Sequence, residues 1–205
     1  MRFKLLVPPL LTVSFILAAL SANSQTVAPY QGKGFPIEIG IGPSGYEPDW
    51  GQGRMYGGAA WADFYPRNVP YFLRGFGIET EVRDISLDKH LQGGPDPQRT
   101  GQGNTKEDTA GGGIIYNWRL FHFFHPYVKF LVSEGSVDFI SSSPTYSHDT
   151  RAVLAPGGGG EFRVYGPVWA RVDYEYQDWG TLLHNTLTPS GLTAGVSYDF
   201  SHSTR

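Results

Sequence analysis

Leu192-Thr193-Ala194-Gly195-Val196-Ser197-Tyr198-Asp199-Phe200 is the stretch that decides the fold. Its even-numbered residues are apolar and end in two aromatics, whereas its odd-numbered residues are small or polar. Because successive side chains of a β-strand point to opposite faces, the stretch predicts a strand with one apolar and one polar face. Such a strand suits lipid on one side and a polar lumen on the other, although an ordinary amphipathic strand of a soluble protein has the same alternation.

The same alternation recurs along the chain, which favours a sheet built from many such strands. It is clearest where Phe76, Ile78 and Val82 alternate with Glu79 and Arg83. We predict about eight strands, at residues 37–42, 54–65, 72–83, 109–119, 128–139, 157–164, 168–177 and 192–200.

One predicted strand departs from the simple pattern. In residues 128–139, Val137 is apolar but out of phase with Val132 by one position. A single extra residue in one strand would restore the phase, so the slip predicts a β-bulge near Glu134 and Gly135.

The connections between the predicted strands alternate between long and short. The first, third, fifth and seventh are long, and they include the polar stretches Asp84–Asp108 and Ser141–Thr150. A membrane barrel with its N-terminus in the periplasm has this pattern, with long loops outside the cell and short turns inside. The sequence therefore predicts an all-β fold, an eight-stranded antiparallel up-and-down transmembrane β-barrel.

Aromatic side chains also gather at the two ends of the predicted strands. We expect Tyr65, Tyr127 and Phe200 in a belt at the short-turn end, and Tyr46 and Trp179 in a belt at the long-loop end. Tyr and Trp are enriched at the two membrane interfaces.

The composition excludes several classes of protein. The 205 residues include 27 Gly, 12 Tyr and 13 Phe, and interior glycine weakens a helix by roughly 1 kcal/mol, so a helical fold is disfavoured. The formal net charge of −3 disfavours a nucleic-acid partner, which needs a basic face. The absence of cysteine excludes disulfides, thiolate metal sites and a cysteine nucleophile.

The N-terminus has the features of a secretory signal peptide. Arg2 and Lys4 precede the uncharged, mostly apolar residues 5–20, and Ala22 and Ser24 are small residues suited to signal peptidase. A membrane anchor would need a longer apolar span. We predict a signal peptide at 1–24 that is cleaved before Gln25, a lead segment at 25–34, a barrel domain at 35–200 and a polar tail at 201–205.

Together these residues resemble the small outer-membrane β-barrel family that includes OmpA transmembrane domains, OmpX-like proteins and opacity proteins. The resemblance covers Phe35 to Phe200 and includes the alternating run from Trp169 to Tyr176. It implies a location in the bacterial outer membrane and a monomer that contacts lipid and lipopolysaccharide. It also implies that the barrel-assembly machinery binds the chain during insertion and that the outer loops could bind a surface ligand.

The last strand also resembles the C-terminal signal by which outer-membrane barrels are recognised for assembly. The signal has a polar residue, a glycine two positions later, and aromatics three and five positions beyond the glycine. The matching residues are Thr193, Gly195, Tyr198 and Phe200. Barrels of this class usually end on the final aromatic, whereas this chain continues for five residues.

Charged residues on the polar faces predict a network inside the barrel. The predicted network consists of Glu79, Glu81, Arg83, Arg119, Lys129, Glu161, Arg163, Arg171, Asp173 and Glu175. An eight-stranded barrel is just wide enough for side chains to fill, and unpaired buried charges are costly, so we expect these charges to pair as a plug. A gated path for protons or ions is the alternative.

No residue pattern supports catalysis, a cofactor or a metal site. His122 and His125 flank a short turn, and His148 and His184 lie in outer loops without a serine or second carboxylate placed beside them by spacing. We therefore expect a non-enzymatic barrel with a structural or adhesin-like role carried by its outer loops. A narrow porin-like channel and, less favoured, a lipid-modifying barrel enzyme are the alternatives.

Overall fold

The computed structural model describes residues 34–48, 54–67, 69–70, 73–87, 104–118, 123–140, 147–182 and 185–201. The predicted signal peptide, most of the lead segment and residues 202–205 of the tail lie outside this part. Among the described residues, no helix is long and apolar enough to cross a membrane.

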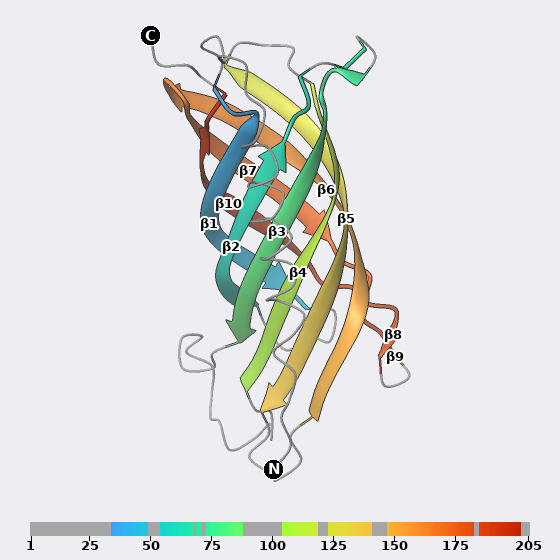
Figure 1. Cartoon of the computed structure of the whole chain (residues 1–205). Helices are drawn as coiled ribbons and strands as arrows, with labels where there is room; N and C mark the ends of the chain where they lie inside the picture. The colour runs from blue at the N-terminus through green and yellow to red at the C-terminus, as the bar shows by residue number, and fades with distance from the viewer. Residues whose placement is uncertain are drawn as a thin grey trace, which may run out of the picture. The chain divides into compact units, whose positions relative to one another are not determined.

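Eight strands form a closed antiparallel barrel, in which neighbours along the chain pair with each other and the last strand pairs with the first (Figure 1). The barrel strands are β1 (Ile37–Glu47), β2 (Met55–Phe64), β3 (Phe76–Leu87), β4 (Asn104–Asn117), β5 (Phe124–Ile140), β6 (Ser147–Tyr165), β7 (Val168–Tyr176) and β10 (Ser190–Asp199). A short hairpin of β8 (Thr181–Leu182) and β9 (Asn185–Thr186) separates β7 from β10. The predicted fold class is confirmed.

The barrel is apolar outside and polar inside. On β3, Phe76, Ile78 and Val82 are exposed on the outer surface, whereas Glu79 and Arg83 are buried in the interior. Since strand geometry sends alternate side chains to opposite faces, one alternating sequence builds both surfaces at once.

The predicted bulge in β5 is wrong. The pairing of β5 with β4 and β6 runs without interruption through residues 134–137. Glu134 is exposed outside, and Val137 is fully buried inside. At this outer end polar residues such as Glu134 lie on the exterior and apolar residues such as Val137 lie in the interior, so the hydrophobic pattern of β5 inverts without any shift in register. The irregularity in pairing lies instead between Arg163 and Tyr165, where β6 meets β7.

Three strands extend farther than their sequence patterns predict. β4, β5 and β6 have 14, 17 and 19 residues, whereas about 9–11 residues cross a bilayer. In Figure 1 their ends project beyond β1, β2 and β7 at the end opposite the start of β1. Parts of the stretches predicted as loops, Asp84–Leu87, Asn104–Asp108 and Ser147–Thr150, are therefore strand.

An aromatic girdle surrounds the outside of the barrel at its short-turn end. The rings of Phe124 and Phe162 lie 4.7 Å apart, as do those of Tyr198 and Phe200. Another chain of ring contacts joins Phe76, Tyr116 and Trp118. Four aromatics that the sequence analysis placed in the belts instead lie buried inside: Tyr46, Tyr65, Tyr127 and Trp179.

Candidate functional site: the polar lumen

Lys129 lies at the centre of the lumen, inside a cage of four carboxylates. Its Nζ atom is 3.0 Å from Glu79, 2.7 Å from Glu81, 2.9 Å from Asp173 and 3.1 Å from Glu175. Carboxylate oxygens of Glu79, Glu81 and Asp173 lie within 4.8 Å of one another, close enough to hold a cation. The ammonium of Lys129 supplies that positive charge from within the chain.

Arg171 joins the same cage from the short-turn side. Its guanidinium lies 3.0 Å from Asp63, 2.7 Å from Glu79 and 3.1 Å from Asp173. These three partners come from β2, β3 and β7, so one side chain connects strands on different sides of the barrel. Charge-assisted hydrogen bonds of this kind are among the stronger ones in proteins.

Aromatic rings hold Arg171 in place. The centre of its guanidinium is 4.5 Å from the ring of Tyr127 and 4.8 Å from the ring of Trp61, both cation–π distances. Arg171 Nε also donates a hydrogen bond to the Tyr127 hydroxyl, which in turn donates to Asp173 at 2.8 Å. The tyrosine thus completes a closed ring of polar contacts.

Arg83 forms the outer layer of the network. Its guanidinium pairs with Glu81 and, at 2.6 Å, with Glu175. It also lies 4.4 Å from the centre of the Tyr46 ring. Gln177 donates a hydrogen bond to the same Glu175 at 3.1 Å.

Buried carboxylates also lie beyond both ends of this network. Toward the short turns, Glu161 accepts a hydrogen bond from Asn117 at 2.8 Å, and Glu38 accepts one from Ser197. Toward the outer end, Glu107 is 1% exposed and neither of its carboxylate oxygens has a hydrogen-bond partner among the described residues. In the described lumen, eight buried acidic side chains face three buried cationic side chains, so acidic groups are in excess.

Glycines on the inner face make room for large side chains. A Cβ atom at Gly40 or Gly195 would collide with the Trp61 ring, and one at Gly77 would lie 2.7 Å from Tyr65. Small and large residues therefore alternate to fill the barrel, as small barrels require.

Two apolar clusters lie at the outer end of the interior. One consists of Val137, Val153, Trp179 and Leu187. The other consists of Tyr46, Met55, Ile85 and Leu87. The backbone of Trp179 bonds to that of Leu187 at 3.0 Å, and its indole nitrogen donates to Gln177 at 2.9 Å. The segment after β7 therefore folds inward against the polar network.

Most of the predicted network residues lie together in the lumen. Those buried there are Glu79, Glu81, Arg83, Lys129, Glu161, Arg171, Asp173 and Glu175. Arg119 lies outside the described residues. Arg163 departs from the expectation, because it is exposed next to the β6–β7 turn, where it donates a hydrogen bond to the Gly166 carbonyl. The irregular pairing after Arg163 ends the regular alternation there.

Several lumen residues were missing from the predicted network. Glu38 and Asp63 lie on the inner faces of their strands and could have been found by the same alternation. Glu107 could not, because its part of β4 was expected to be loop. Tyr127 was missed because aromatics near strand ends were expected to face the lipid.

Of the four residues that resemble an assembly signal, two lie on the inner face of β10 and two lie on the outer surface, at or just after its end. Thr193 is buried and its hydroxyl lies 2.7 Å from that of Ser44. Gly195 lies beneath Trp61. Tyr198 and Phe200 are exposed on the outer surface.

With this geometry in view, comparisons with known proteins identify the family. Residues 15–200 match the family described as "Outer membrane protein beta-barrel domain". The chain belongs to this family. The protein is accordingly located in the bacterial outer membrane, and its apolar outer surface faces lipid. No curated protein matches the sequence.

Solved structures of small outer-membrane barrels have the same fold. Neisserial surface protein A has a TM-score of 0.62 and 15% identity, over 80% of this chain and 97% of its own. OprG from Pseudomonas aeruginosa has a TM-score of 0.53 and 14% identity, over 84% of this chain and 99% of its own. Ail of Yersinia pestis, solved in complex with the heparin analogue sucrose octasulfate, has a TM-score of 0.52 and 15% identity, over 79% of this chain and 97% of its own.

Proposed function

We propose that the protein is a non-conducting outer-membrane barrel with a structural or surface-interaction role. The observation that carries this proposal is the caged ammonium of Lys129, whose four carboxylate partners come from β3 and β7, with β5 supplying the lysine. A side chain held from several strands fills the middle of the lumen. The apolar clusters around Trp179 and Met55 fill its outer end.

The long strands support an interaction role at the outer end. β4, β5 and β6 continue past the apolar band, and Lys106, Asp108 and Glu134 lie on the outer face of these extensions. Charged side chains are costly on a lipid face, so this part of the wall stands in water. Residues 88–103, which join β3 to β4, and residues 141–146, which join β5 to β6, lie outside the described part of the chain and are the proposed carriers of the interaction.

The structure of Ail with a heparin analogue supports the idea that a barrel of this fold can present a ligand-binding surface. For the present protein we propose a surface ligand bound at the outer loops, without assigning its chemistry. The proposal further includes export by the signal peptide at 1–24, assembly through Thr193, Gly195, Tyr198 and Phe200, and a monomeric barrel. It includes no catalytic activity.

Conductance across a planar bilayer tests the closed lumen. The refolded protein is first shown to be folded by its shift in gel mobility on heating, and current is then recorded. We expect no discrete current steps. Reproducible steps would overturn the closed-lumen proposal.

Adhesion tests the interaction role separately. Bacteria that display the whole barrel are compared with bacteria that display a variant in which a short Gly/Ser linker replaces residues 88–103. We expect only the whole protein to increase binding to immobilised matrix proteins or glycosaminoglycans. Equal binding by both strains would contradict a role for this loop.

A narrow cation channel is the second candidate. The excess of buried carboxylates over cationic side chains favours it, because a negatively charged lumen attracts cations. Under this alternative, the bilayer recording would give steps with a reversal potential that follows the cation gradient.

A further inference from the structure

A buried carboxyl group lies in an apolar seam at the outer end of the barrel interior. Strand pairing places Glu107 of β4 directly between Ile85 of β3 and Val137 of β5. Ile85 belongs to one of the two apolar clusters at this end, and Val137 belongs to the other. An apolar residue at position 107 would connect the two clusters. Glu107 is instead 1% exposed, and neither of its carboxylate oxygens has a hydrogen-bond partner among the described residues.

The segment that follows β7 closes the Val137 side of this seam, and we call its residues 178–182 and 185–187 the cap. Trp179 and Leu187 of the cap belong to the same buried cluster as Val137. Two backbone hydrogen bonds, of 2.8 and 3.0 Å, join the start of the cap to β6. The contact of the cap with the seam is made by apolar side chains, and such packing is favourable because it excludes water.

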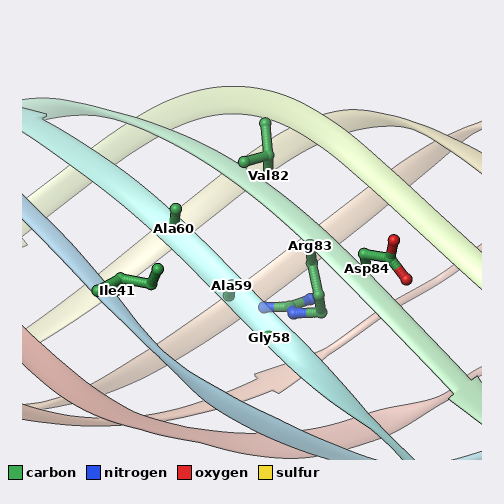
Figure 2. A pocket seen from close by; sticks show the side chains of 7 residues that line it. All are labelled: Ile41, Gly58, Ala59, Ala60, Val82, Arg83 and Asp84. Atoms are coloured by element: carbon green, nitrogen blue, oxygen red, sulfur yellow. The ribbon is translucent and has the colours of Figure 1, made fainter.

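Glu107 lies outside the part of β4 that faces lipid. Its chain neighbours Lys106 and Asp108 have exposed, charged side chains on the outer face, where they require water rather than hydrocarbon. On the adjacent strand, Arg83 points into the lumen and the exposed Asp84 points outward (Figure 2). The seam is therefore an inner feature of the wall that stands above the membrane.

Burial dominates the ionisation of this carboxyl group. It raises the pKa of Glu107 to about 7, the Arg83 guanidinium opposes the rise, and the carboxylates of Glu175 and Asp108 add to it. The guanidinium of Arg83 is already paired with two other carboxylates. The remaining charged or titratable groups on inner faces at this end include the Tyr46 hydroxyl, which donates to Glu175, and the half-buried Arg151 on β6.

We propose that Glu107 is a pH-sensitive latch for the cap: the neutral acid lets the cap close over the seam, and the ionised carboxylate draws in water and releases the cap. The physical reason is that a charge without hydrogen bonds is strongly unfavourable in an apolar seam, whereas an open seam supplies water. The closed form therefore holds the proton more tightly than the open form does. Opening should rise with pH, by up to about tenfold for each pH unit between about pH 4.5 and about pH 7.

Fluorine NMR of the whole protein, labelled with 5-fluorotryptophan and held in detergent micelles, tests the proposal. The chain has five tryptophans, and Trp179→Phe identifies the resonance of Trp179. We expect this resonance to move with a midpoint near pH 7, while that of Trp118 on the outer wall stays in place.

Hydrogen exchange measures the size of the effect. The amide of Trp179 donates to the Leu187 carbonyl at 3.0 Å within the cap. Relative to its intrinsic exchange rate, this amide should lose up to about tenfold in protection for each pH unit below about pH 7. Neither measurement records current, so a failure here leaves the proposed closed lumen standing.

Matched variants separate Glu107 from the other titrating groups. Glu107→Gln keeps the size of the side chain but removes its charge, and Glu107→Leu makes the seam apolar, so both should abolish the movement of the Trp179 resonance. Glu134→Gln removes a carboxylate from the exposed outer face of β5 and should leave the movement unchanged. The double variant His148→Gln, His184→Gln should also leave it unchanged, although histidine ordinarily titrates in this range.

All variants are first shown to fold by heat-dependent gel mobility. A Trp179 resonance that does not move in the parent protein would overturn the proposal. So would a movement that persists in Glu107→Gln or that disappears in the histidine double variant.

Discussion

The ammonium of Lys129 on β5 lies 3.0 Å from the carboxylate of Glu79 on β3, with the whole of β4 between them along the wall. The contact spans the inner face of β4 and joins two strands that are not hydrogen-bonded to each other. It couples parts of the wall that share no backbone hydrogen bonds. Its loss should therefore weaken the barrel as a whole.

Lys129→Met tests this coupling. The change leaves four buried carboxylates without their shared ammonium, and breaking a buried ion pair typically costs about 3–5 kcal/mol. We expect a loss of this size in the free energy of unfolding, measured by urea titration of the barrel in lipid vesicles. Lys106→Met is the matched control, because its ion pairs with Asp84 and Asp108 are exposed and should contribute less than about 1 kcal/mol. Similar losses in both variants would contradict a special role for the cage.

Arginine on the lipid-facing surface should destabilise the barrel. Ile78 and Val172 are exposed on the apolar band, so Ile78→Arg or Val172→Arg should cost about 2–4 kcal/mol near the bilayer midplane. Ala152→Arg is the control, because Ala152 is also exposed on the outer wall but pairs with Glu134, above the hydrocarbon. The same unfolding titration distinguishes them, and equally mild effects would mean that the lipid-facing band is misplaced.

Gly135→Ala should disturb the outer end of the lumen. A Cβ atom at Gly135 would lie 2.6 Å from Cζ3 of Trp179 and 2.7 Å from Cγ2 of Val153, with the tryptophan ring making the closer approach, so both side chains must shift. Overpacking of this kind costs about 1–3 kcal/mol. Thermal unfolding of the single variants and of the double variant with Trp179→Leu gives a double-mutant cycle. If the collision with the tryptophan is the main cause, Gly135→Ala should lower the stability much less in the Trp179→Leu background. An unchanged loss of stability would show that this collision is not the cause.

Phe200→Ala tests the proposed assembly signal. The phenylalanine side chain is exposed on the outside, so its removal should leave spontaneous refolding in detergent nearly unchanged. In cells, we expect the folded, heat-modifiable form in the outer membrane to fall to a minor fraction. Phe162→Ala removes a similarly exposed girdle aromatic from β6 and serves as the control. Equal decreases in cells would attribute the effect to the girdle rather than to a signal.

The sequence by itself determined which side chains face lipid and which face the interior over most of the wall. Ile78 and Glu79 illustrate this on β3, as do Val172 and Arg171 on β7. The reason is local: strand geometry alternates side chains with a period of two, and a lipid exterior requires apolar residues on one face. The number of strands and their order followed from repeating this pattern with alternating long and short connections.

Only the tertiary structure decided which charges meet. Lys129 reaches carboxylates on β3 and β7 because closure and stagger of the barrel bring those positions to the same height, and no alternation within one strand encodes that height. The same closure decided that Val137 and Trp179 pack inside at the outer end, where the medium outside the wall changes from lipid to water. The pattern of a single strand shows only that its apolar residues move from one face to the other. Whether a bulge or a change from lipid to water outside the wall causes this move depends on where the closed barrel crosses the membrane boundary.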